Sequence, residues 1–204
     1  MKFREVYSLL RKKIIANEKW WPHESRFEII VGAILGQNVN WNNAHLAIVN
    51  LKKEKILNPQ KIIDADDDFL KELIKPAGFF NAKSMYLKNI SKWFIQNDEY
   101  AKNLDTATLR RKLLKVKGIG DETADDILIY VYDRSVFIYD LYARRMLKYF
   151  GFGDFKNYKN AKKSLDNEFI KENFTAKEAK IFHALIVEAG KIAKKDNWKE
   201  IFDV

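Results

Sequence analysis

The sequence predicts an all-α fold, and three observations lead to that prediction. Apolar residues recur at three- and four-residue intervals along most of the 204 residues, which is the period of a helix with one buried face. A single strand-like run, at residues 135–139, is too short to indicate a sheet. No low-complexity linker and no repeat of roughly 20–50 residues divides the chain. Short loops should therefore join several helices of modest length.

The apolar positions place these helices along the chain. The stripe at residues 27–35 is the clearest, because its apolar residues fall on one face over two turns. The helix at residues 70–74 should stop near Pro76 and Gly78, since both residue types end helices. The helix at 141–150 should end at Gly151, where glycine favours a left-handed cap. The other expected helices lie at residues 46–51, 86–94, 109–114, 124–131 and 181–192.

The composition excludes several classes of function. There is no cysteine, so disulfides, thiolate zinc sites and thiolate-held iron–sulfur clusters are excluded. His23, His45 and His183 are widely separated and have no ligand-like spacing, so we expect no metal and no cofactor. The net charge of +9 favours a polyanionic partner. An AT-rich genome, which enriches lysine, would produce the same charge without such a partner.

The chain shows no sign of a membrane location. No stretch approaches the ~18 uninterrupted apolar residues of a membrane span. The first residues contain no apolar signal core. We therefore expect a cytoplasmic monomer without a membrane partner, associated with the nucleoid if its source is bacterial.

The most specific segment is residues 113–124, Leu-Leu-Lys-Val-Lys-Gly-Ile-Gly-Asp-Glu-Thr-Ala. Two glycines let the backbone turn tightly and approach a partner, and the isoleucine between them can pack into the helix pair. The amides that begin the second helix would face outward with the helix dipole behind them, which makes an anion site. A plain helix–turn–helix joint is the alternative, but the flanking apolar residues favour a phosphate site. Its predicted residues are Lys117, Gly118, Ile119 and Gly120.

Four motifs in order resemble the helix-hairpin-helix–GPD superfamily, the endonuclease III-like DNA glycosylases. The hairpin is one, and residues 137–140, Phe-Ile-Tyr-Asp, resemble the turn that closes the family's motif. Residues 32–38, Gly-Ala-Ile-Leu-Gly-Gln-Asn, resemble its early helix and DNA-inserting loop. Residues 78–83, Gly-Phe-Phe-Asn-Ala-Lys, resemble its Gly-aromatic-aromatic-Asn-x-Lys turn. The resemblance spans about residues 20–150 and continues weakly to residues 183–191.

This resemblance implies a protein that acts on double-stranded DNA containing damaged bases. Residues 22–130 would form one helical lobe, and residues 1–21 with 131–204 the other, with the flipped-out nucleotide in the cleft between them. Asp140 would be the catalytic carboxylate that stabilises charge on the sugar and orients water. Gln37 and Asn38 would fill the gap left in the duplex. Taken without the resemblance, Asp140 is an N-cap of the following helix.

Two acidic residues depart from the family's hairpin. Bifunctional relatives carry a lysine shortly after Gly-x-Gly that attacks the sugar and forms a Schiff base. Glu122 occupies that position and cannot form an imine, which implies a monofunctional glycosylase without AP-lyase activity. Asp121 should weaken phosphate binding unless it points away, although both acids also favour a helix N-terminus. The cysteines of the family's iron–sulfur cluster are absent.

Four further residues resemble the cluster-free 3-methyladenine DNA glycosylase III branch, in which aromatic rings sandwich the flipped base. They are Trp20, Trp21, Pro22 and Trp41. A 3-alkyladenine nucleoside is cationic, so its base needs no leaving-group acid and is attracted to π faces. Ordinary packing is the alternative role for each tryptophan.

Other features of that branch do not carry over. Its late-helix lysine corresponds to Leu185, and the nearby His183 is interpreted as a core histidine. Two other functions stay open: a glycosylase for another lesion, such as an oxidised or mismatched pyrimidine, and a noncatalytic DNA-binding protein.

Overall fold

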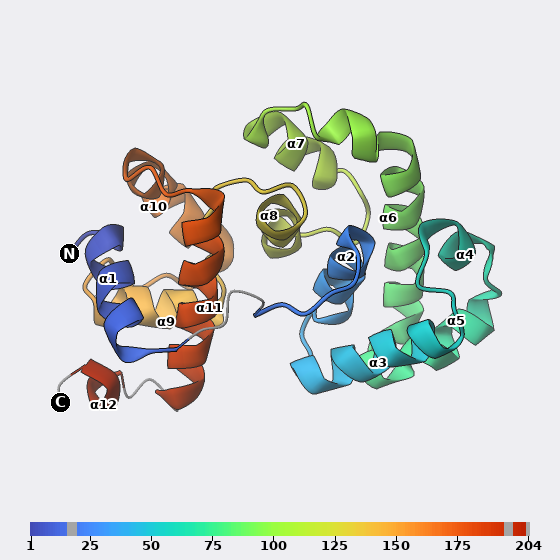
Figure 1. The fold of residues 1–204 in the computed structure, drawn as a ribbon, viewed down its shortest axis with the longest axis horizontal. Coiled ribbons are helices and arrows are strands. Elements are labelled where there is room, and N and C mark those ends of the chain that lie inside the picture. The colour runs from blue at the N-terminus through green and yellow to red at the C-terminus, as the bar shows by residue number, and fades with distance from the viewer. Residues whose placement is uncertain (16–19, 194–197, 203–204) are drawn as a thin grey trace. The chain divides into compact units, whose positions relative to one another are not determined.

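The computed structural model describes residues 1–15, 20–193 and 198–202. The described residues form helices and no strand, which confirms the all-α prediction (Figure 1). The helices are α1 (Phe3–Lys13), α2 (Arg26–Leu35), α3 (Trp41–Lys53), α4 (Pro59–Asp64), α5 (Asp67–Ile74), the short 3-10 helix η1 (Lys75–Ala77), α6 (Phe80–Ala101), α7 (Thr106–Leu113), α8 (Asp121–Tyr130), α9 (Leu141–Tyr149), α10 (Tyr158–Lys171), α11 (Ala176–Ile192) and α12 (Lys199–Phe202).

The chain divides into two compact units. Unit 1 contains residues 1–22 and 133–204, and unit 2 contains residues 23–132. Unit 1 therefore joins the start of the chain, blue in Figure 1, to its yellow and red end. Helices α2 to α8 belong to unit 2, and α1 with α9 to α12 belong to unit 1.

Helix α2 forms the centre of unit 2. Nine of its ten residues are buried, and a helix that is apolar all round is stable only when other helices cover it. Helices α3, α6 and α8 pack against it. Its first turn is capped by Ser25, whose side chain accepts a hydrogen bond from the amide of Glu28. The position of α2 fixes the residues that follow it, which include Gln37 and Asn38.

The core of unit 1 is aromatic. Phe137 lies in the strand-like run and packs edge-on against Phe3 of α1 and Phe182 of α11, with ring centroids 5.0 and 5.3 Å apart. The run itself is extended and buried from residue 136 to 139 without pairing to a described strand. The run is therefore apolar because it is buried among helices and not because it belongs to a sheet. It ends directly at Asp140, so this packing also places that carboxylate.

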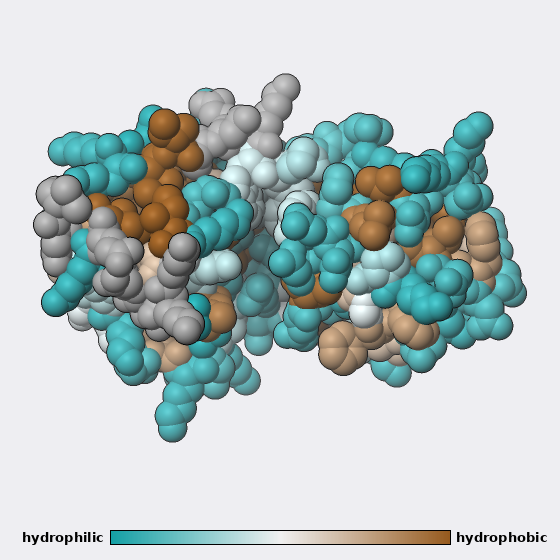
Figure 2. Space-filling model, turned by 90° about the horizontal axis from the view of Figure 1, so that it is seen from below, coloured by the Kyte–Doolittle hydropathy of each residue, from teal (hydrophilic) through white to brown (hydrophobic). Residues whose placement is uncertain are grey.

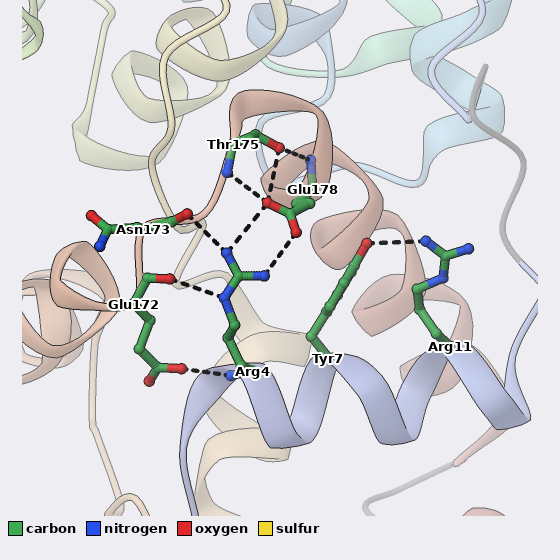
Figure 3. Close-up of polar contacts among 7 residues, drawn as sticks. All are labelled: Arg4, Tyr7, Arg11, Glu172, Asn173, Thr175 and Glu178. Atoms are coloured by element: carbon green, nitrogen blue, oxygen red, sulfur yellow. Dashed lines mark hydrogen bonds and ion pairs between the residues drawn. The ribbon is translucent and has the colours of Figure 1, made fainter.

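Helix α1 is tied to the turn between α10 and α11 (Figure 3). The Glu172 carboxylate accepts hydrogen bonds from the amides of Phe3 and Arg4 at 2.9 and 2.7 Å, which caps the start of α1. The Arg4 guanidinium pairs with Glu178 at 2.7 Å and donates to the Glu172 carbonyl at 2.9 Å. The hydrogen bond from Arg4 lowers the pKa of Glu178 to about 2. This network joins the two ends of unit 1.

Two helix ends test the sequence prediction directly. Helix α5 ends at Ile74, just before Pro76 and Gly78, as predicted. Gly151 has φ 79 and follows α9, as predicted. Its amide bonds the Lys148 carbonyl at 3.2 Å, and the Phe152 amide bonds the Leu147 carbonyl at 2.9 Å, which is a Schellman cap. Helices α4, α10 and α12 had no predicted counterpart.

The surface is mostly hydrophilic on the face drawn in Figure 2, where hydrophobic residues occur as separate patches. Exposed apolar side chains such as Leu46 and Ile170 come from different helices, and scattered exposure of this kind is ordinary for folded proteins. Among the described helices, none has the length and apolar character required to cross a bilayer.

Candidate functional site

The hairpin predicted to bind phosphate joins α7 to α8. Gly118 has φ 106, a conformation that favours glycine, and Ile119 is buried as predicted. Gly120 is the N-cap of α8 and has no side chain to bond the first-turn amides. Lys117, on the preceding turn, is exposed. The start of α8 therefore has the dipole and the uncapped amides that bind an anion.

Helix α6 supports the hairpin from behind. The ring of Tyr86 packs so closely on Gly118 that an added Cβ would lie 2.2 Å from its Cγ. Asn89 donates a hydrogen bond to the Lys117 carbonyl at 3.2 Å. Glycine at position 118 is therefore required both by its backbone conformation and by the aromatic ring behind it.

Gln37 also holds the hairpin. Its side-chain nitrogen donates to the Gly118 carbonyl at 3.0 Å and to the Thr123 hydroxyl at 2.9 Å. The gap-filling role of Gln37 stays a prediction, but in this structure its carboxamide positions the turn between α7 and α8. The next residue, Asn38, is exposed and has φ 53, so it is the side chain that the loop presents to solvent.

Arg110 pairs with two of the acidic residues of α8. Its guanidinium bonds Asp121 at 2.7 Å and the fully buried Asp125 at 2.8 Å. The Asp121 charge is therefore directed to an arginine and neutralised there. Glu122 is exposed in the first turn of α8, where a carboxylate is favoured by the helix dipole.

Lys83 is a buried lysine that joins two loops. Only 2% of the residue is exposed, and its ammonium donates to the carbonyls of Leu35, Gln37 and Ala77 at 2.8, 2.9 and 2.8 Å. Burial lowers its pKa to about 8, so the ammonium is still protonated at neutral pH. Phe79 lies beyond Ala77, 70% exposed and with φ 47.

Asp140 is the N-cap of α9, as its place in the sequence predicts. One carboxylate oxygen accepts the Ala143 amide at 2.7 Å. The other, Oδ2, lies 3.7 Å from Nε2 of the buried His183, which projects from α11. About 14% of the Asp140 side chain is exposed. The cap therefore occupies one oxygen and fixes the direction of the other.

Trp20 belongs to the same part of unit 1. Its ring packs edge-on against His183 at 5.4 Å and Trp21 at 6.3 Å, and its indole nitrogen donates to Glu188 at 2.8 Å. Burial opposes ionisation of Glu188, but hydrogen bonds from Lys191 and Trp20 outweigh it and lower the pKa of Glu188. Trp20 is thus held in place beside the residue that faces Asp140.

The other predicted base-pocket residues are more exposed. Trp21 is half-buried and Pro22 is exposed. Trp41 begins α3 in unit 2, 39% exposed, with its ring centroid 6.5 Å from that of His45. The structure thus brings Trp20 and Trp21 together in unit 1 with Asp140. Leu185 is part of the core, and the described residues contain no cluster of three potential metal ligands.

Sequence reasoning gave no role to Arg110, included Lys83 only as the last residue of the family-like turn at 78–83, and treated His183 only as a core residue. A lysine or arginine on a helix is usually interpreted as solvent-exposed, so the helical pattern did not indicate that Lys83 is buried or that Arg110 is half-buried. The His183 interpretation was correct about burial. The family-like spacing of the late helix was the only signal that it lies near Asp140.

Comparison with known proteins adds independent findings. A family model described as HhH-GPD superfamily base excision DNA repair protein matches residues 31–170. A Methanocaldococcus jannaschii protein named "Putative DNA repair glycosylase MJ1434" is 43% identical over 195 residues, covering 92% of this chain and 87% of that protein. Endonuclease III of Sulfolobus acidocaldarius is 29% identical over 193 residues, covering 94% of this chain and 84% of that one.

Solved structures resemble this chain over most of its length. One of them is the H. pylori 3-methyladenine DNA glycosylase bound to 1,N6-ethenoadenine, with 27% identity and a TM-score of 0.77. The match covers 96% of this chain and 100% of that one.

Proposed function

Because the chain belongs to the HhH-GPD superfamily of base excision DNA repair proteins, we propose that it is a monofunctional glycosylase for alkylated purines such as 3-methyladenine. The observation that carries the chemistry is the Asp140 carboxylate. One oxygen is held by the helix cap and the other is directed toward His183. A carboxylate fixed in this way pays no reorganisation cost when positive charge develops nearby.

The proposed reaction replaces the glycosidic bond by a bond to water. The electron pair of that bond passes to the cationic purine, which leaves as a neutral base. Positive charge then develops on the sugar, where the Asp140 carboxylate stabilises it and orients or deprotonates the water that adds to C1′. No acid is needed for a leaving group that is already cationic. Glu188 suits this chemistry poorly as an acid, because its lowered pKa keeps it ionised.

The hairpin would grip the DNA backbone. The uncapped start of α8 and the exposed Lys117 offer amides and a positive charge to a phosphate. The exposed Asn38 and Phe79, both with positive φ, would enter the duplex where the nucleotide leaves it. Glu122, in place of the imine-forming lysine, supports hydrolysis by water and an intact abasic product.

The choice of alkylated purines rests on the aromatic residues and on similarity. Trp41 of unit 2 is exposed, and Trp21 of unit 1 is half-buried; each indole by itself is a π face of the kind that attracts a cationic base. The H. pylori structure that resembles this chain is named for 3-methyladenine. The 29% identity to an endonuclease III supports a second candidate, a glycosylase for another damaged base.

A panel of duplexes, each with one defined lesion, tests the proposal. We expect release of 3-methyladenine, a product strand that stays intact until alkali is added, and no adduct after borohydride treatment. Strand cleavage with a trapped adduct would show that a lysine reaches C1′. Release of oxidised pyrimidines alone would favour the second candidate, and DNA binding without release of any base would favour a noncatalytic protein.

Stacking on Trp41 can be tested by truncation. Trp41→Ala should lower base release by the equivalent of roughly 1–3 kcal/mol, the usual contribution of one aromatic–base stack. The loss should be larger for a cationic base, which loses both stacking and cation–π attraction, than for a neutral base, which loses stacking alone. The measurement is single-turnover release of 3-methyladenine and hypoxanthine, with Phe69→Ala, an exposed aromatic on α5, as control. Equal losses for both bases would show that cation–π attraction to Trp41 does not contribute to base release.

A further inference from the structure

Two exposed loop tips of unit 2 have left-handed backbone conformations. Asn38 has φ 53, and Phe79 has φ 47 and is 70% exposed. A positive φ is unusual for residues other than glycine and is a clear strain for a bulky aromatic. Such strain persists only when surrounding contacts enforce it. The contacts that enforce it here should therefore lie just beneath the two tips.

Lys83 makes those contacts. Its three ammonium hydrogens match the carbonyls of Leu35, Gln37 and Ala77, which is the full donor capacity of a lysine. Gln37 precedes one tip directly, and Ala77 lies two residues before the other. Leu35 ends α2, where a positive charge is favoured by the helix dipole and free carbonyls need partners.

We propose that Lys83 is a positioning residue whose ammonium joins the Asn38 and Phe79 tips into one DNA-inserting unit. The proposal rests on the proposed function, because it assumes that these tips enter the duplex. It assigns Lys83 no contact with DNA. A separate, mobile tip would lose conformational freedom on insertion, whereas tips held by a common ammonium have lost it already.

Chemical replacement of the ammonium tests this role. The chain has no cysteine, so Lys83→Cys creates a single reactive thiol. Alkylation in denaturant with 2-bromoethylamine, followed by refolding, restores a lysine-like ammonium; 1-bromopropane adds a neutral chain of nearly the same length. The matched control is Lys88→Cys with both reagents. Lys88 lies on the same helix and donates to the carbonyl of Ala65 at 2.8 Å, away from the tips.

The main readout is the fluorescence of 2-aminopurine placed opposite a tetrahydrofuran abasic analogue in a duplex. Insertion unstacks this base and raises its emission, and no base is released. The ammonium form of position 83 should raise the emission as the unmodified protein does, and the propyl form should lose most of the rise. Both forms of position 88 should match the unmodified protein.

Activity supplies a second readout. The propyl form of position 83 should release base from duplex at least about tenfold more slowly than the ammonium form, because it loses three hydrogen bonds and one charge-assisted bond alone corresponds to about that factor. Release from single strands should change much less, because single strands carry little unstacking cost. Melting temperatures of both forms identify any general loss of folding. If the propyl form does not refold, the double substitution Asn38→Ala, Phe79→Ala in the unmodified chain tests, with the same two readouts, whether the tips insert into the duplex.

The outcomes separate the two proposals. Equal fluorescence for the ammonium and propyl forms overturns the role of Lys83, as does an unmodified protein that produces no fluorescence rise. An unmodified protein that raises the emission but releases no base from any lesion contradicts the glycosylase proposal, and the comparison at position 83 still tests Lys83.

Discussion

Asp140→Asn should lower base release by about 10²- to 10⁴-fold, the usual contribution of a catalytic acid or base. Asparagine has the same shape and caps a helix about as well as aspartate, so the bond to the Ala143 amide should remain. The negative charge that would stabilise the sugar is lost. DNA affinity should be unchanged or slightly higher, because a charge of the same sign as the phosphates has been removed.

Two comparisons separate catalysis from capping. Asp140→Ala removes the cap as well and should cost about 1 kcal/mol of stability in addition to activity. Asp66→Asn alters another N-cap, that of α5, and should leave base release unchanged. Single-turnover release, circular dichroism and DNA affinity are the measurements. If Asp140→Asn retains activity within about tenfold, below the usual contribution of such a group, the residue is an N-cap and the catalytic group lies elsewhere.

The second large effect is expected at the hairpin, where the two glycines should behave differently. At Gly120 an added Cβ has nothing within 4 Å, and φ is −91, which any residue adopts. Gly120→Val should therefore fold but keep a phosphate from the α8 amides. DNA affinity should fall about tenfold or more, the value of one charge-assisted hydrogen bond, and equally for all sequences.

Gly120→Ser makes this test sharper. Serine is a better N-cap than glycine, so this variant should be slightly more stable than the natural chain while its side chain occupies an amide that phosphate would use. Stability and affinity would then change in opposite directions. Unchanged affinity in both variants would contradict the phosphate site.

Gly118 should respond through the fold. A Cβ there would lie 2.2 Å from Tyr86 Cγ at a φ of 106, so Gly118→Ala should cost about 1–3 kcal/mol of stability from backbone strain and overpacking. Its DNA affinity would fall together with its melting temperature. Position 118 therefore tests packing, and position 120 tests contact with DNA.

Local features were readable from the sequence. The period of apolar residues predicted α2, α6 and α8, because burial of one helix face repeats every three to four residues. The cap at Asp140 and the left-handed turn at Gly151 were predictable because each depends on hydrogen bonds that span no more than five positions. Ala161, Leu165 and Phe169 of α10 also have helical spacing, but with only three buried positions in fourteen residues that helix was hard to recognise.

What the sequence by itself determined is therefore the helical class, the hairpin and its glycines, and the residue that caps α9. The tertiary structure decided which charged and polar side chains are buried and what they hold. Lys83 bonds a carbonyl 48 residues away, and Gln37 bonds a hydroxyl 86 residues away. In the sequence, long polar side chains such as these are compatible with either a solvent-exposed helix face or a buried site. Only the packing of α2, α6 and α8 creates the buried carbonyls that require a donor.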